Sequence, residues 1–289
     1  MKTRSMTPAR AALLTAAFGV VFITAALTGP AGAHVLEGPH ILELTAEAMG
    51  SIATLQVDQK LMIYPQTPEA TPTTLDETAT YVLPERFRSD ILSEQVQRTH
   101  LVFGDHGLTV IDGRMAVDET PYDLYQRLLR SRTRPRLMRT LNRLGVETAI
   151  ASLGRLDEKV VFVVGARYPD ESVSQLAVDK ETFLPIRLLL TEGEQQPDGS
   201  RLEIFYHNWQ KSQSGWFPWQ VLFYLNGRLA REIRVTGLRL NPSIPADMMD
   251  LEALKASVAA RDADAAHGHT QEAVEAVQQG VEDVQKKFE

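Results

Sequence analysis

Short segments in which apolar and polar residues alternate dominate this sequence and constrain its fold most strongly. In the first segment, polar residues separate Leu55, Val57, Leu61 and Ile63. A period of two is that of a β-strand with one buried face. Further strand-like runs lie at 74–83, 86–92, 95–103, 108–111, 158–166, 172–179, 185–191, 201–209, 216–225 and 228–240. Asp198-Gly199 and Asn226-Gly227 are strong hairpin signals between them. The pattern predicts a mainly β fold with some α: one curled antiparallel sheet of ten or eleven strands.

Helical spacing interrupts these strands in two places. A short helix begins near Pro39 and ends before Gly50. The second place is a helical insertion at 121–153, where we expect two helices followed by a third turn-and-helix built on Val146, Ile150 and Leu153. The insertion is predicted to form a lid, whose apolar side is Leu124, Leu128, Leu137, Met138 and Leu141.

Both ends of the chain differ from its body. Residues 1–33 have the features of a cleavable signal peptide: a basic start, an uncharged apolar run at 11–27, and Ala31-Gly32-Ala33 as a small-residue cleavage signal. The alternative is an uncleaved membrane anchor. Residues 34–250 then form the binding domain, and 251–289 form an acidic tail with a short helical seam from Val274 to Phe288. We therefore expect an exported, periplasmic protein.

Composition and motifs argue against several functions. The absence of cysteine excludes disulfides, thiolate metal sites, a cysteine nucleophile and a lipid anchor on an N-terminal cysteine. The net charge of −7 argues against a nucleic-acid partner. None of the catalytic motifs that mark nucleophile elbows, phosphate loops or zinc helices is present, so we predict no enzyme, no cofactor and no metal. One alternative is an N-terminal copper site at His34, near His40.

The most unusual stretch in composition is 127–143. It carries seven arginines and no acid, and we call these side chains the basic patch: Arg127, Arg130, Arg132, Arg134, Arg136, Arg139 and Arg143. On two helices they are expected to lie opposite the apolar stripe. They are either solvated helix faces or a surface that meets anionic lipid headgroups or an acidic partner.

All three tryptophans stand in an aromatic-rich stretch at 205–224. Aromatic residues pack well in cores. The inner side of a sheet that does not close can also hold an acyl chain, which needs only an apolar cavity.

Three stretches and a turn that follows them resemble the LolA-type periplasmic lipoprotein carriers, also described as outer-membrane lipoprotein-sorting proteins. The opening strand Leu55 to Tyr64 follows a short helix, as in that family. Residues 81–88 (YVLPERFR) are similar to its "P-x-x-F-R" strand, and residues 178–187 (VDKETFLPIR) are similar to its "D-x-x-T-x-L-P-x-R" hairpin. Gly215-Trp216-Phe217-Pro218 is similar to its "G-x-W-F-P" turn. The family links a basic residue before the first proline to cargo transfer, whereas this chain has Leu83.

The resemblance implies an unclosed β-barrel with helices on its concave side. It also implies a non-enzymatic carrier or chaperone that shelters acyl chains of lipoproteins or lipids, with an inner-membrane transporter and an outer-membrane acceptor as partners. An envelope-stress or lipid sensor on the same fold is the alternative. We expect the cavity to be lined by Leu61, Ile63, Tyr81, Phe87, Leu101, Phe103, Phe205, Trp209, Trp219, Val221, Phe223, Ile233 and Val235.

Overall fold

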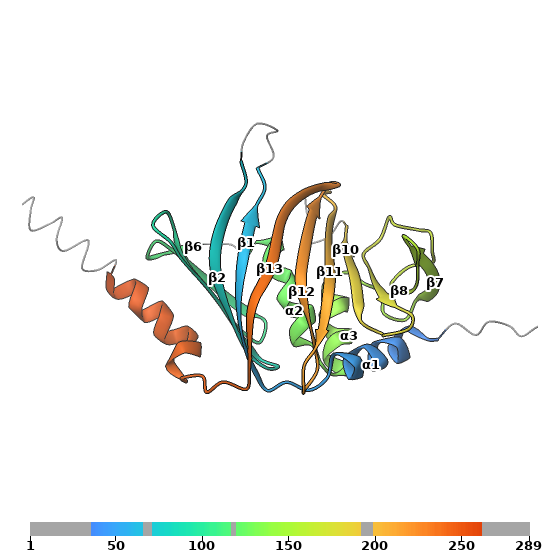
Figure 1. Ribbon diagram of the computed structural model, residues 1–289, viewed down its shortest axis with the longest axis horizontal. Coiled ribbons are helices and arrows are strands. Elements are labelled where there is room, and N and C mark those ends of the chain that lie inside the picture. Colours follow the sequence, from blue (N-terminus) through green and yellow to red (C-terminus); the bar gives the residue numbers. More distant parts are fainter. Residues whose placement is uncertain (1–35, 66–70, 117–119, 192–198, 262–289) are drawn as a thin grey trace, which may run out of the picture. The chain divides into compact units, whose positions relative to one another are not determined.

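A single antiparallel sheet organises the protein. The structure is a computed structural model that describes residues 36–65, 71–116, 120–191 and 199–261. Within these ranges, thirteen strands pair in the order β6-β5-β4-β3-β2-β1-β13-β12-β11-β10-β9-β8-β7. Two meanders therefore meet where β1 pairs with β13 (Figure 1). The edge strands β6 and β7 do not pair with each other, so the sheet is open, as predicted.

The first meander contains six strands. They are β1 (Thr54–Ile63), β2 (Thr73–Val82), β3 (Arg86–Leu92), β4 (Gln97–Phe103), β5 (His106–Ile111) and β6 (Arg114–Ala116). Its long central pair, β1 and β2, is in register from Thr54 opposite Val82 to Ile63 opposite Thr73. Residues 55, 57 and 61 therefore share one face with 75, 79 and 81.

The second meander contains the other seven strands. They are β7 (Ala151–Leu156), β8 (Lys159–Val164), β9 (Gln175–Asp179), β10 (Pro185–Leu190), β11 (Leu202–Lys211), β12 (Trp216–Leu225) and β13 (Arg228–Leu240). Asn226 and Gly227 form the β12–β13 turn, both at positive φ, as the hairpin signal predicts.

Helices lie against one face of the sheet, which we call the inner face. They are α1 (Gly38–Met49), the 3₁₀ helix η1 (Pro121–Leu124), α2 (Tyr125–Arg130) and α3 (Arg134–Arg143). In Figure 1, β11 to β13 cross in front of α2 and α3. Ile41, Leu128 and Leu141 join the strand residues in one continuous apolar core.

The prediction of a third turn and helix at the end of the insertion is wrong. Residues 146–150 are irregular with one turn at Thr148-Ala149, and Ala151–Leu156 is strand β7. The apolar residues Val146, Ile150 and Leu153 are spaced by three or four, which suits a helix, but over so few residues this spacing does not separate a helix from a strand that follows a turn.

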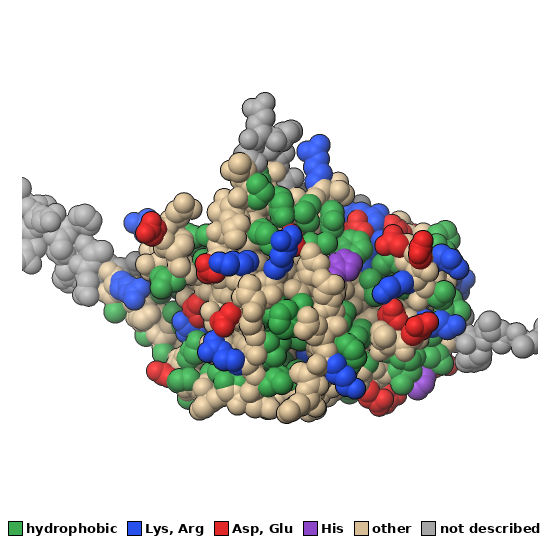
Figure 2. All heavy atoms as spheres, in the orientation of Figure 1, with side chains coloured by type: hydrophobic (Ala, Val, Ile, Leu, Met, Phe, Trp, Pro, Cys, Tyr) green, Lys and Arg blue, Asp and Glu red, His purple; other side chains and the backbone are tan. Residues whose placement is uncertain are grey.

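The opposite face of the sheet, which we call the outer face, carries charges of both signs. Figure 2 shows basic and acidic side chains interspersed with apolar ones over the strands. One part is covered: η2 (Asp247–Met249) lies against β3, and Arg88 Nη1 donates to Met248 O at 2.7 Å. Residues 251–261 continue as a helix.

Two expectations fall on residues that the structure does not describe. The signal peptide at 1–33 and the seam from Val274 to Phe288 both lie outside the described ranges. In the described part of the chain, none of the helices combines the length and apolar character needed to cross a bilayer.

Candidate functional site

The inner face brings together most of the residues expected to line a cavity. Seven of them are buried in the core that the helices cover: Leu61, Tyr81, Phe87, Val221, Phe223, Ile233 and Val235. Three more are partly buried and pack against that core: Ile63, Trp209 and Trp219. The indole N–H of Trp209 donates to Pro185 O at 2.9 Å.

Three expected cavity residues lie on the outer face instead: Leu101, Phe103 and Phe205. In β4, Val102 lies opposite Phe87 and joins the core, so its neighbours Leu101 and Phe103 point the other way. In β11, Ile204 and Tyr206 are core residues, and Phe205 between them packs on Tyr224 and His207. Successive side chains of a strand alternate between faces, which removes these three from an inner cavity.

The expected apolar side of the lid lies against the sheet. Leu124, Leu128, Leu137 and Leu141 are almost fully buried, and Met138 is partly buried against the same core. Aromatic rings of the lid pack against rings of the sheet. The ring centroid of Tyr125 lies 6.3 Å from that of Phe87 and 5.7 Å from that of Phe223, and the ring centroids of Tyr122 and Phe223 are 6.0 Å apart. The lid side chains therefore occupy the inner face of the sheet.

A buried polar cluster on β1 to β3 was not predicted. Gln59 Nε2 donates to Glu77 Oε2 at 2.8 Å, and the Ser89 hydroxyl donates to Glu77 Oε1. All three residues are buried. Burial raises the pKa of the Glu77 carboxyl, and the two hydrogen bonds only partly oppose this rise. The sequence held a signal, because each of the three shares the parity of inner apolar neighbours such as Val57, Ala79 and Phe87.

A buried ion pair fastens η1 to the sheet. Arg98 Nη2 on β4 lies 2.8 Å from both carboxylate oxygens of Asp123, which also accepts a hydrogen bond from the Thr120 hydroxyl. Burial acts to raise the pKa of Asp123, but Arg98, His100 and the hydrogen bonds outweigh it, so the pKa lies below its ordinary value. Asp123 is therefore charged at neutral pH and holds the lid at one defined position.

The loop between α2 and α3 carries a second anchor, Arg132. Its guanidinium donates to Met49 O at the end of α1 and, at 3.2 Å, to Trp216 O at the start of β12. Backbones approach closely at this point, since a Cβ on Gly215 would lie 2.2 Å from Met49 O. Burial lowers the pKa of Arg132 to about 10, which still leaves it protonated at neutral pH.

The basic patch consists of two inward arginines, three exposed ones and the half-buried Arg127 and Arg136, so the expectation that all seven lie opposite the apolar stripe is wrong. Arg130 and Arg132 turn inward because backbone carbonyls of the sheet and of α1 accept their hydrogen bonds. Arg130 donates to Glu85 O at 2.8 Å and to Gly104 O at 3.3 Å. Arg134, Arg139 and Arg143 are exposed on α3.

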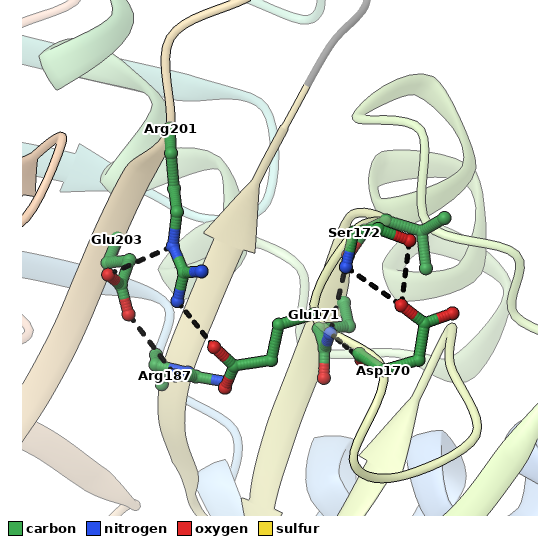
Figure 3. Close-up of polar contacts among 8 residues, drawn as sticks. Asp170, Glu171, Ser172, Arg187, Arg201 and Glu203 are labelled. Carbon is green, nitrogen blue, oxygen red and sulfur yellow. Dashed lines mark hydrogen bonds and ion pairs between the residues drawn. The ribbon is translucent and has the colours of Figure 1, made fainter.

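A separate charge network lies on the outer face of the second meander (Figure 3). Arg187 contacts Glu171 at 2.6 Å and Glu203 at 3.2 Å, and Arg201 contacts the same two carboxylates at 2.6 and 3.1 Å. Two positive and two negative groups balance, so the network fastens the 170–172 turn to β10 and β11 and leaves no net charge for a ligand.

The copper alternative stays a prediction, because its central residue is not among the described ones. Those residues contain no cluster of three or more histidine and carboxylate side chains that could hold a metal ion. His34 lies outside the described ranges, and His40 is exposed beside Glu43, 3.5 Å away.

Comparisons with known proteins agree with this architecture. No protein-family model matches the sequence, and no curated protein matches it either. Among solved structures, an outer membrane lipoprotein-sorting protein domain from Vibrio parahaemolyticus has a TM-score of 0.50 at 9% identity, covering 75% of this chain and 98% of that one. A LolA superfamily protein from Nitrosomonas europaea has a TM-score of 0.50 at 12% identity, covering 75% and 99%.

These likenesses extend over almost the whole length of both solved chains. They cover three quarters of this chain. The chain therefore has the fold of the LolA superfamily.

Proposed function

We propose that this protein is a periplasmic, non-enzymatic carrier or chaperone that binds the acyl chains of lipoproteins or lipids on its inner face. The observation that carries the proposal is that this large apolar face is covered by short helices and not by a second sheet. Helices that are attached at only a few points can detach from the inner face, whereas a second sheet packed on it would cover it permanently.

The free energy gained by burying the lid leucines is comparable to the free energy gained by burying an acyl chain. Five leucines of the lid are almost fully buried: Leu124, Leu128, Leu129, Leu137 and Leu141. At about 1.5–3 kcal/mol each, their burial is worth roughly 7–15 kcal/mol. A chain of about 16 carbons gains roughly 13 kcal/mol at about 0.8 kcal/mol per methylene. An acyl chain can therefore replace the lid side chains on the inner face without a large net cost.

Lid displacement is the loading step in this proposal. The Arg98–Asp123 pair and the Arg132 contacts mark where the lid must detach or pivot. The signal peptide expected at 1–33 delivers the chain to the periplasm, where lipoproteins pass between an inner-membrane transporter and an outer-membrane acceptor.

Neighbouring valines on β8 provide a matched test. Val164 is fully buried on the inner face, and Val163 is 3% exposed in the small outer cluster with Val161 and Ala177. Replacing either by threonine keeps its shape and buries a hydroxyl. V164T is expected to weaken binding of a fluorescent fatty acid by about tenfold, the result of a loss of about 1.4 kcal/mol. V163T is expected to leave that affinity unchanged.

Two results would refute the proposal. One is equal fatty-acid affinity in V163T and V164T, since a chain on the inner face would meet only residue 164. The other is a protein purified from its native periplasm that contains no lipid by mass spectrometry and takes up no fatty acid.

A further inference from the structure

Five arginines of α2 and α3 surround a pocket of about 250 Å³ at the rim of the sheet. They are Arg127, Arg130, Arg136, Arg139 and Arg143. On α3, residues 136, 139 and 143 are separated by three and four, so they share one helix face. Residues 127 and 130 share the facing side of α2. The turn residues Glu85, Gly104 and Asp105 close the opposite wall.

Arginines outnumber acids in the lining of the pocket. Five guanidinium groups and two carboxylates line it, and each carboxylate is paired with an arginine. Arg136 contacts Glu85 at 2.7 Å, and Arg143 pairs with Asp105. Arg139 is exposed and makes no ion pair with any other residue that the structure describes.

The lowered pKa values of Glu85 and Asp105 indicate a positive electrostatic potential in the pocket. The hydrogen bond from Arg136 is the main cause that lowers the pKa of Glu85, and Arg130 adds to it. The hydrogen bond from Arg143 lowers the pKa of Asp105, with further contributions from Arg127 and Arg130. At least two guanidinium groups therefore stabilise the charged form of each acid. The same positive potential attracts any other anion that enters the pocket.

We propose that this pocket binds a phosphate group. Guanidinium groups form paired hydrogen bonds with phosphate oxygens, and several of them around one small space provide more donors than a carboxylate can accept. The volume lies below the roughly 300 Å³ at which pockets for drug-sized molecules begin, and it suits a small anion or a single headgroup. The phosphate has two sources, a lipid headgroup or a free phosphate. The inference needs no acyl chain on the inner face.

Arg139 allows a test that spares the fold. Its replacement in R139Q removes one donor that stabilises nothing else among the described residues. R155Q is the matched control, because Arg155 is also exposed, has no ion pair in the described ranges and lies on β7 outside the pocket. Inorganic phosphate is expected to bind R139Q about tenfold more weakly than wild type, because the variant loses one hydrogen bond to a charged group; tenfold corresponds to about 1.4 kcal/mol.

A gain-of-binding variant separates a binding role from a structural one. D105N removes a carboxylate that competes for Arg143, and it is expected to tighten phosphate binding severalfold. Calorimetry with phosphate measures all three variants and the wild type, with sodium chloride at matched ionic strength as the control for screening. The proposal is overturned if R139Q and R155Q bind phosphate equally, or if chloride reproduces the effect.

Vesicles then identify the source. Phosphatidylcholine vesicles containing phosphatidylglycerol, compared with pure phosphatidylcholine, present the phosphodiester on a lipid. Vesicle binding that R139Q weakens and free phosphate displaces supports the site with a lipid headgroup as its ligand. Phosphate binding without vesicle binding supports it with a soluble phosphate. An acidic peptide that binds through Arg139 while phosphate does not compete would overturn the proposal and point to a protein partner.

Discussion

The two halves of the inner face hold their helices in different ways. Under η1 and α2, the first meander presents polar groups: Glu77 and His100, which are buried, and Arg98, whose side chain is 13% exposed. On the second meander, the inner side chains of β8 to β10 are apolar: Phe162, Val164, Leu176, Val178, Leu188 and Leu190. Polar contacts depend on direction and fix one position, whereas apolar contacts accept any partner of suitable shape. The first half holds the lid in register, and under the proposed function the second half is where an acyl chain replaces protein side chains.

The largest effect is expected where the polar half holds the lid. Asp123→Ala leaves Arg98 buried without its partner, at a cost of about 3–5 kcal/mol in the free energy of unfolding measured with urea. Because the pKa of Asp123 lies below its ordinary value of 3.8, this stabilisation is present above that pH and is lost as pH falls through the lowered pKa. The difference between variant and wild type should shrink in acid.

An exposed ion pair of the same meander is the control. Lys60 and Asp76 lie 2.6 Å apart, with 45% and 76% of their side chains exposed. Asp76→Ala should cost less than about 1 kcal/mol, since solvent screens such pairs. Equal costs for the two alanine variants would contradict the anchoring role of Asp123.

The first half also shows how far sequence reasoning extends. Alternation and turn signals placed most strands of both meanders within a few residues of their observed bounds, because hairpins are local. The faces of β4 could not be assigned in this way. Its inner positions hold Arg98 and His100, whose burial depends on Asp123 and Thr109 elsewhere in the chain. The apolar residues Leu101 and Phe103 therefore suggested the wrong face.

The lid could be predicted only in part for the same reason. The leucine stripe of 124–141 follows from helical spacing, and all of its leucines are buried. The inward turn of Arg130 and Arg132 could not be predicted, since it depends on carbonyls of Met49, Glu85 and Gly104 that tertiary folding brings to them. Buried Glu77 depends likewise on Gln59 and Ser89 from two neighbouring strands.

A cavity made in each half should behave differently toward ligands. Leu188→Ala in the apolar half and Ile91→Ala in the polar half each remove a buried side chain, at about 2–5 kcal/mol. The cavity at 188 has apolar walls and should accept a fatty acid that restores part of the lost stability. The cavity at 91 borders Glu77 and Arg98 across the sheet and should fill with water. Thermal unfolding of each variant with and without fatty acid measures the stability that the ligand restores. An equal rise in Tm for both variants would contradict the distinction between the halves.

Neutralising the buried acid should stabilise the polar half. The pKa of Glu77 is raised, so the folded protein loses stability as pH rises from the ordinary value of 4.5 through the raised pKa. Glu77→Gln removes that loss, and with Gln59 turned to accept its amide the hydrogen bonds persist. A gain of about 1 kcal/mol corresponds to a rise of roughly 2–4 °C in Tm at neutral pH. The gain should vanish at pH 4, and a gain that is independent of pH would contradict the assignment to the carboxyl.

The smallest effect is expected on the outer face of the apolar half, in the network of Figure 3. Glu171 is 40% exposed, and its replacement in Glu171→Gln leaves Arg187 and Arg201 both paired with Glu203. The cost should not exceed about 1 kcal/mol, because solvent screens the lost pair. Burial acts to raise the pKa of Glu171, but its hydrogen bonds with Arg187 and Arg201 lower it overall. The small stabilisation is thus present above pH 4.5 and lost below it.

The fatty-acid affinity of Glu171→Gln should equal that of the wild type, since the network lies on the face opposite the proposed cavity. A changed affinity would show that the two faces of the second meander are coupled.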